Sequence, residues 1–410
     1  MKGKFSFHYG WVVCLCATFI FFINVGFTNS AFGVHLPYII NSLGCTNAEA
    51  SLIVSVRTAA TMLALCLADI YIKKFGIKRG LEYALFVGVL GFLSFAFAAG
   101  LPVYYFGGFC IGLASGFGGF MVLSMLLHQW FKDSLGLALG VCAAGSGFAV
   151  IILPPLLTKL INSIGLNKVF IFEALMEALA LLLSVLLVFS SPQEKALKPY
   201  ENGKQNLENV DKRSSGIDIS SGIFLIALMS AAMAFTGAGG HTGTFFTLLY
   251  TGLGYSETAA AAMYSAVGCI LTAAKLVFGR LSDAIGAYKT ALIAYAIFTA
   301  GCVFCCFAGK QSALINILAI AFQGVGLVVT TITITAMAED LSTDESFPRL
   351  LKIMNIFYFL GILVGSYILG LLADITGNYV VSFALCGFFS FASAALVIII
   401  YKIGKRKKAA

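Results

Sequence analysis

Residues 191–220, SPQEKALKPYENGKQNLENVDKRSSGIDIS, form the long polar stretch that divides this 410-residue chain. Their mixed charge and scarcity of apolar residues indicate a flexible linker. The sequence on either side is overwhelmingly apolar, with six long apolar segments before the linker and six after it. The linker therefore predicts an N-terminal half at 1–190 and a C-terminal half at 221–410.

Each apolar segment is long enough to cross a bilayer as a helix, which takes about 20 apolar residues. The sequence thus predicts an all-α membrane protein with twelve transmembrane helices in two six-helix pseudo-symmetric halves. The expected spans are 11–39, 47–72, 80–99, 102–127, 134–161, 168–190, 221–250, 256–281, 288–308, 312–336, 350–374 and 378–402.

Composition excludes a water-soluble fold of this size, because 60% of the residues are hydrophobic and 11% are charged, against about 25% charged in soluble domains. The 11 cysteines lie nearly all inside apolar segments, so we infer no disulfides. Cys302 and Cys305 are interpreted as packing residues rather than a redox pair. The N-terminal apolar segment is too long for a cleavable signal. No phosphate-binding loop is present, which argues against ATP-driven transport by this chain.

The distribution of Lys and Arg among the loops predicts the orientation. With the N-terminus placed inside, the inner segments hold 21 of these cations and the outer segments hold 3. The outer three are Lys159, Lys168 and Lys310, whereas Arg57 and Lys275 lie within spans. The net charge of +8 is therefore read as topological rather than as a nucleic-acid surface. We expect a multi-pass protein of a bacterial-type plasma (inner) membrane with both termini in the cytoplasm.

The two halves repeat a spacing. Gly44 begins the second span and Gly254 the eighth, and 29 residues lead from each to a short inner turn, at Lys73 and Asp283. Repeated halves around a site near the bilayer midplane are typical of secondary transporters.

Several motifs make the chain resemble the major facilitator superfamily and, within it, the monocarboxylate porters and bacterial oxalate:formate antiporter-like carriers. They are Tyr9-Gly10-Trp11-Val12-Val13, Phe32-Gly33-Val34-His35-Leu36-Pro37, Ala48-Glu49-Ala50-Ser51, Gly112, Gly116 and Gly118, Trp130-Phe131, Gly136-Leu137-Ala138-Leu139-Gly140, Ala144-Gly145-Ser146-Gly147 and Pro154-Pro155. The resemblance covers nearly the whole chain except the linker and tails.

The resemblance implies a gating motif, Gly-x-x-x-Asp before a basic turn, whose charges hold the halves together in one state. The second copy keeps it at Gly279 and Asp283, next to Arg280. The first copy has Asp69 and Lys73 at those positions, where they could pair along one helix. The gating role of the first copy is therefore in doubt.

Lys275 is the sharpest candidate for substrate binding. A charge inside a span costs roughly 2.5–3.5 kcal/mol on insertion scales and usually faces the bundle interior. The resemblance implies that this position of the eighth span, usually Arg, binds a substrate carboxylate. The alternative is a lysine that snorkels or forms a structural pair.

Other candidates lie on the same expected path. Arg57 is either a second anion contact, an outer-gate residue or a structurally paired charge. His241 is either a proton carrier or a packing residue. Asn24, Thr28 and His35 form one stripe of the first span, which faces either a cavity or another helix. Tyr358 lies near an aromatic or cationic position of the oxalate-exchange type.

Proton coupling is left open. The resemblance implies an Asp one turn before Lys275 and a Lys in the first span, but this chain has Leu271 and Ser30 there. Glu173 and Glu177 share one face of the sixth span, and their role is open as well.

Taken together, these observations predict a secondary active transporter of a small organic anion, a monocarboxylate or small dicarboxylate, working by alternating access as symporter or anion exchanger. A proton or counter-anion is the possible coupled species, and a monomer in the lipid bilayer is expected, without metal, cofactor or nucleic acid. The alternatives are an efflux carrier for amphipathic compounds and a non-transporting membrane sensor. A membrane-embedded enzyme is disfavoured, because no clustered nucleophile or metal set is present.

Overall fold

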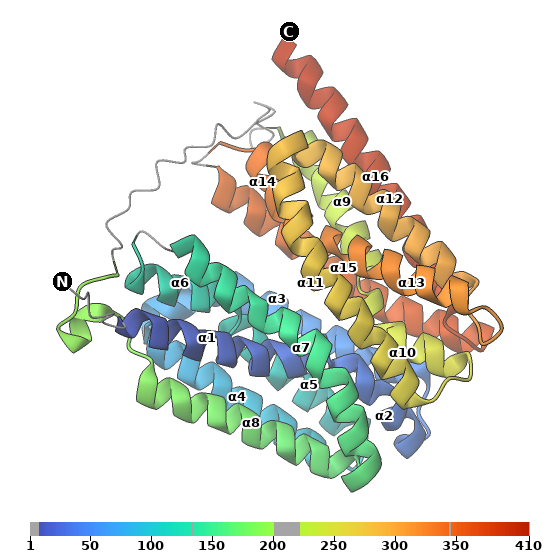
Figure 1. Ribbon diagram of the computed structural model, residues 1–410, viewed down its shortest axis with the longest axis horizontal. Helices are drawn as coiled ribbons and strands as arrows, with labels where there is room; N and C mark the ends of the chain where they lie inside the picture. Colours follow the sequence, from blue (N-terminus) through green and yellow to red (C-terminus); the bar gives the residue numbers. More distant parts are fainter. Residues whose placement is uncertain (1–7, 133–134, 201–221, 344–345, 410) are drawn as a thin grey trace, which may run out of the picture. The chain divides into compact units, whose positions relative to one another are not determined.

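The computed structural model describes residues 8–132, 135–200, 222–343 and 346–409, and its described residues are almost entirely helical (Figure 1). It has 12 helical segments long and apolar enough to cross a membrane, which confirms the predicted number. They are Tyr9–Ser30, Asn47–Phe75, Ile77–Ala96, Leu101–Trp130, Leu137–Ile164, Leu166–Leu187, Ile223–Gly252, Glu257–Ser282, Ala287–Cys306, Ala313–Asp340, Arg349–Thr376 and Val380–Gly404.

The chain forms two compact units. Unit 1 comprises residues 1–32, 60–153 and 159–209, and unit 2 comprises residues 33–59, 154–158 and 210–410. The units group residues by contact, so the second span is shared between them. The predicted division into halves at 190 and 221 stays a prediction, and most of the predicted linker, 201–220, lies outside the described residues.

In unit 1, helix α4 (Ile77–Ala96) packs against both α5 (Leu101–Phe117) and α8 (Leu166–Leu187). The contact with α5 is close because glycines line it. A Cβ atom added at Gly91 would lie 2.6 Å from Ile111 Cγ2, and one added at Gly107 would lie 2.6 Å from Phe95 Cε1. Small residues bring helix backbones together where lipid gives no hydrophobic drive for association.

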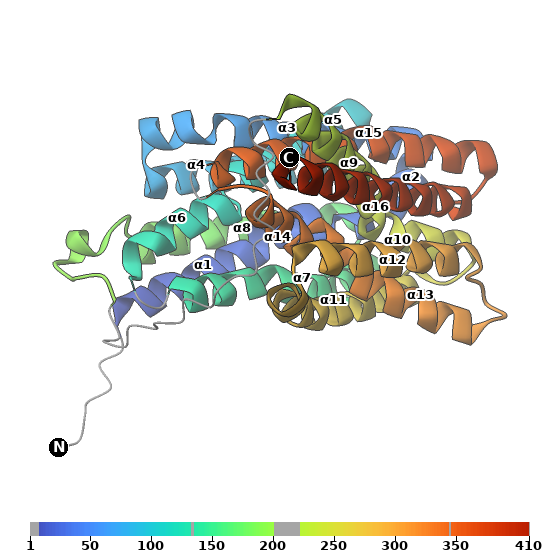
Figure 2. The same ribbon diagram turned by 90° about the horizontal axis from the view of Figure 1, so that it is seen from above.

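In unit 2, helix α9 (Ile223–Gly240) lies against both α15 (Phe347–Thr376) and α16 (Val380–Ala409) (Figure 2). Helices α11 (Glu257–Ile285) and α12 (Ala287–Cys306) both pack against α13 (Ala313–Gly326). The side chain of Ser256 caps α11 by accepting a hydrogen bond from Ala259 N at 3.3 Å.

The turns support the predicted duplication. Gly44 and Gly76 are 32 residues apart, as are Gly254 and Gly286, and all four have positive φ between 62° and 88°. They begin and end the second and eighth spans. Only glycine adopts a positive φ without a steric penalty from a Cβ atom. Glycine therefore recurs at the same spacing at the ends of the second and eighth spans.

Four spans are broken, at every third position along the chain. The first consists of α1 (Tyr9–Val25), a π-helical turn at Gly26–Ser30, a 3₁₀ turn at Phe32–Val34 and α2 (His35–Leu43). The fourth breaks at Gly118 and Gly119, before α6 (Phe120–Trp130). The seventh breaks at His241, before α10 (Thr242–Gly252), and the tenth breaks at Leu327–Thr331, before α14 (Ile332–Asp340). Discontinuous spans are the usual walls of transporter binding sites.

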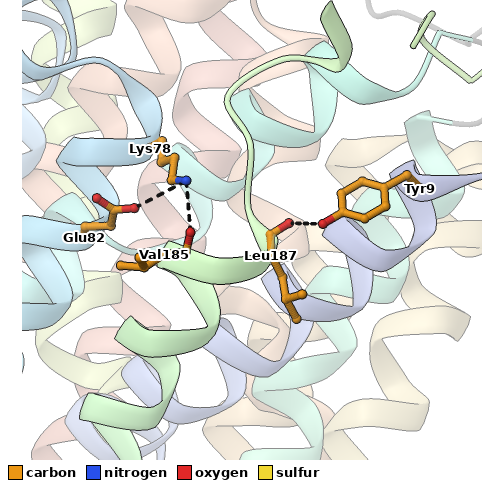
Figure 3. A network of polar contacts seen from close by, with 5 residues as sticks. All are labelled: Tyr9, Lys78, Glu82, Val185 and Leu187. Carbon is orange, nitrogen blue, oxygen red and sulfur yellow. Dashed lines mark hydrogen bonds and ion pairs between the residues drawn. The ribbon is translucent and has the colours of Figure 1, made fainter. Parts of the chain in front are cut away.

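Polar contacts hold the C-terminal end of α8 against α1 and α4 (Figure 3). Tyr9 Oη donates to Leu187 O at 2.9 Å, and Lys78 Nζ donates to Val185 O at 3.1 Å and lies 3.9 Å from Glu82 Oε1. Both carbonyls belong to the last turn of α8, where the helix itself supplies no donor.

Residues 191–200 differ from the predicted flexible linker. Tyr200 N donates to Trp130 O at 2.8 Å, Lys132 N donates to Tyr200 O at 3.1 Å, and the Lys195 ammonium lies 3.7 Å from the centroid of the Tyr9 ring. Aromatic side chains with these backbone bonds hold the start of the segment, which polarity alone did not predict.

Candidate functional site

The first half of helix α3 (Asn47–Phe75) is fixed within unit 2 by α15. The Asp374 carboxylate accepts hydrogen bonds from the backbone N–H of Asn47 and of Ala48, both at 2.8 Å, so a side chain of another helix caps α3. Two turns further along, Ser55 Oγ donates to Leu363 O at 2.8 Å. These bonds fix the register of α3 just before Arg57.

Arg57 is buried within unit 2, with 1% of its surface exposed. Its guanidinium interacts electrostatically with Tyr264 of α11 and with His241 at the break of the seventh span. The structure therefore brings together two of the predicted residues, Arg57 and His241. Tyr264, which sequence reasoning missed, is the third member of this cluster.

His241 is the residue at which the seventh span breaks, between α9 and α10. Its Nε2 lies 2.8 Å from Thr244 Oγ1, and its ring meets Phe245 edge-on at 6.0 Å between centroids. Across from it, Tyr264 fills the space at Gly243, where an added Cβ would lie 2.8 Å from the Tyr264 hydroxyl. One hydroxyl therefore holds the imidazole at the point where the seventh span is interrupted.

Polar side chains of the tenth span extend the cluster within unit 2. Thr242 Oγ1 donates to Gln323 Oε1 at 3.0 Å, directly after His241. Tyr358 of α15 hydrogen-bonds the side chain of Thr330, and the methyl of Thr330 fills the space at Gly240. The broken seventh and tenth spans therefore meet in a run of hydroxyl and amide groups, and the predicted residue Tyr358 lies at its edge.

Lys275 lies on the same face of α11 as Tyr264, because 11 residues make just over three full turns. It is farther along by roughly 16 Å at 1.5 Å per residue. The side chain is partly buried. Among the residues that the structure describes, none forms a hydrogen bond or an ion pair with its ammonium.

Asn24 and Thr28, also predicted to contact substrate, belong to unit 1. Both are fully buried. Asn24 Nδ2 donates to Glu177 Oε1 at 2.8 Å, and Thr28 Oγ1 donates to Asn24 O at 2.7 Å. The Asn24 amide nitrogen and the Thr28 hydroxyl are thus engaged within unit 1, and the contact of these residues with substrate stays a prediction.

The predicted gating residues lie at helix ends. Asp69, Lys73 and Arg280 are exposed, and the side chain of Asp283 lies outside the described residues. Their gating role stays a prediction.

The sequence matches one protein family over most of its length. A family profile described as the Major Facilitator Superfamily matches residues 14–274 and 223–410. The chain belongs to this superfamily. It is therefore a membrane transporter rather than an enzyme.

Individual relatives are distant. Monocarboxylate transporter 10 of Rattus norvegicus is 24% identical over 430 residues, covering 98% of this chain and 80% of the relative. Monocarboxylate transporter 13 of Rattus norvegicus is 23% identical over 399 residues, covering 95% of this chain and 88% of the relative. These names agree with the resemblance seen in the motifs.

Solved structures confirm the fold. The nucleoside transporter NupG superposes with a TM-score of 0.74 at 12% identity, covering 97% of this chain and 100% of that one. A D-xylose-proton symporter superposes with a TM-score of 0.71 at 14% identity, covering 94% of this chain and 96% of that one. At such identity the likeness concerns the fold alone.

Proposed function

We propose that this carrier moves a small organic anion, a monocarboxylate or small dicarboxylate, by alternating access, and that Lys275 binds the substrate carboxylate. The observation that carries the proposal is the Lys275 ammonium, which is partly buried in a span and has no partner among the described residues. A cation kept inside a bilayer without a protein counter-charge is suited to an anion that arrives from outside.

The Arg57 cluster supports the same substrate class. Arg57, His241 and Tyr264 place a guanidinium, an imidazole and a phenol together in unit 2, beside the break of the seventh span. We infer that this cluster forms the outer gate of the substrate path. We also infer that it offers a second contact to the anion when the carrier changes conformation. Relatives named monocarboxylate transporters favour this over a neutral substrate.

Replacement of Lys275 tests the proposal. In proteoliposomes, Lys275→Gln is expected to raise the KM for a labelled monocarboxylate such as lactate or formate, or for oxalate, because a hydrogen bond to a charged group is lost. That bond contributes about 1.5–3 kcal/mol, which corresponds to about a tenfold to hundredfold change. Lys275→Arg keeps the charge and is expected to retain transport.

Lys289→Gln is the matched control, since it removes one exposed lysine near the start of α12. The panel also includes a nucleoside, D-xylose and an amphipathic cation. Normal carboxylate transport by Lys275→Gln would refute the role of Lys275. Transport of the neutral or amphipathic compounds alone would refute the substrate class. Counterflow at two pH values distinguishes anion exchange from proton symport.

We also propose that the carrier lies in the plasma (inner) membrane as a monomer.

A further inference from the structure

Two carboxyl groups of α8 lie in the interior of unit 1, and the proposed anion site does not use them. Glu173 and Glu177 are one helical turn apart, and each has 0% of its surface exposed. An isolated carboxylate in such surroundings is strongly destabilised and normally takes up a proton or a cation. Their presence in a span therefore requires a physical explanation.

Glu177 has a single hydrogen-bond donor among the described residues. Asn24 Nδ2 donates to Glu177 Oε1 at 2.8 Å, while Glu177 Oε2 and Asn24 Oδ1 are both buried without a hydrogen-bond partner in the described part of the chain. Gly88 of α4 makes the room, because a Cβ added there would lie 2.7 Å from Glu177 Oε1. The two side chains are thus tightly enclosed, and each has one oxygen atom without a hydrogen-bond partner among the described residues.

Among the described residues of the helices around it, no Lys or Arg lies next to this carboxyl in the chain or on a neighbouring turn. Helices α1 and α5 and the π-helical turn carry no Lys, Arg, Asp or Glu. On α4 the charged residues Lys78, Arg79 and Glu82 end six residues before Gly88, about 9 Å along the axis. On α8, Lys168 is nine residues away, about 13 Å, and Glu173 is the described charged group that interacts electrostatically with Glu177.

Asn24 links this carboxyl to both broken spans of unit 1. It is the second-last residue of α1, in the turn before the π-helical turn, and Thr28 within the π-helical turn donates to Asn24 O at 2.7 Å. Asn24 Nδ2 also lies 3.4 Å from Ala114 O, and an added Cβ at Gly118, where the fourth span breaks, would lie 3.3 Å from this nitrogen. Irregular backbone inside a transporter marks the parts that bind ions and move.

We propose that Glu177 is a proton-binding site of unit 1 and that Asn24 transmits its protonation state to the breaks of the first and fourth spans. When Glu177 is ionised, the carboxylate accepts a charge-assisted hydrogen bond from Asn24, which is about twice as strong as a neutral one. When a proton from the water phase binds a carboxylate oxygen, that bond weakens and the π-helical turn is released. Proton binding itself is independent of the substrate, whereas symport of one proton with one monocarboxylate rests on the proposed function.

Infrared spectroscopy of the purified, reconstituted protein tests the site without any substrate. A protonated carboxyl has a carbonyl stretch distinct from that of a carboxylate. We expect such a band to be present in the wild type, to disappear reversibly as the pH rises and to be missing in Glu177→Gln. Glu82→Gln, which changes a carboxyl at the start of α4, is expected to retain the band. Asn24→Ala is expected to shift its frequency and titration midpoint.

A band that survives Glu177→Gln would refute the site, and one that disappears in Glu173→Gln instead would assign the proton to the neighbour. If Glu177→Gln fails to fold, as judged by circular dichroism, Glu177→Asp and Asn24→Ala give the same two readouts. In transport, Glu177→Gln is expected to keep counterflow but lose accumulation driven by a pH gradient. Unchanged accumulation would refute coupling, whereas an absence of carboxylate transport in the wild type would refute only the proposed function.

Discussion

Arg57 is a buried charge of unit 2 that interacts with groups on two other spans. A buried guanidinium has five N–H donors, and removing a group that faces it leaves donors unsatisfied, at a cost of about 1–3 kcal/mol. Its electrostatic interactions with Tyr264 and His241 come from two different spans. Arg57 therefore acts as a link between α3, α11 and the broken seventh span.

A double-mutant cycle of Arg57→Gln and Tyr264→Phe measures this link. We expect the free energies of unfolding, followed in detergent, to be non-additive by about 0.5–3 kcal/mol, as found for residues that interact. Additive losses would show that the two side chains are independent. Tyr83→Phe, at an exposed position of α4, is the control and is expected to add to Arg57→Gln without coupling.

Sequence alone identified Arg57 and Lys275, because a charge within an apolar segment is visible in one dimension. It did not identify Tyr264, since tyrosine is ordinary in a span and its meeting with Arg57 depends on tertiary contact. The stripe of Asn24 and Thr28 was recognised with two alternatives, a cavity or another helix. The structure gives it a helix partner, Glu177, that no spacing within the first span could specify.

At the scale of helices, hydropathy predicted each of the twelve spans but none of the four breaks. Hydropathy sums side-chain transfer free energies and contains no information on backbone pairing. Among the glycines of the fourth span, Gly116 packs closely against Ala64 and Thr61, whereas the break falls at Gly118 and Gly119. A break depends on tertiary contacts as well, such as the hydrogen bond that Asn24 Nδ2 donates to Ala114 O just before the break of the fourth span.

The crossing of α9 and α15 depends on two glycines. A Cβ added at Gly361 would meet the backbone of Ala234, and one added at Gly237 would meet the backbone of Tyr358. Backbone cannot move aside as a flexible side chain can. We expect Gly361→Ala to destabilise unit 2 by about 1–3 kcal/mol, the usual range for overpacking, and to lower the midpoint of thermal unfolding in detergent.

Gly252→Ala is the matched control for this substitution, because nothing lies within 4 Å of an added Cβ there and α10 ends at that residue. It is expected to leave the midpoint unchanged. Equal midpoints for the two variants would contradict the close crossing. Tyr358 lies on the same helix, one turn before Gly361. A loss of transport in Gly361→Ala without a loss of stability would therefore indicate that the Tyr358 hydroxyl has been displaced.

For the whole molecule, the strongest inference from sequence was the number of spans, which the structure confirms. The orientation rests on the loop cations alone, 21 against 3. Because the number of spans is even, both termini lie on the same side of the membrane and successive loops alternate between the two sides. Locating one loop therefore fixes the side of all the others.

Cys45, in the loop before α3, is suited to locate that first loop. Burial, and then the Glu49 carboxylate, raise the pKa of its thiol, and the thiolate is the nucleophile. In a variant whose only cysteine is Cys45, an impermeant maleimide added to intact cells is expected to label the protein. The rate should rise with pH beyond about 8.5, the pKa of a free thiol. Glu49→Gln, by removing one charge, is expected to lower that pKa and speed labelling at pH 8.

A second single-cysteine variant, Lys289→Cys in a background without Cys45, places the thiol in the inner turn between α11 and α12. It is expected to be labelled only after the cells are permeabilised, because the loop cations place that turn inside. Labelling of the Lys289→Cys variant in intact cells would invert the orientation. The inner cations would then face outward, and the carrier would violate the positive-inside rule by 21 to 3.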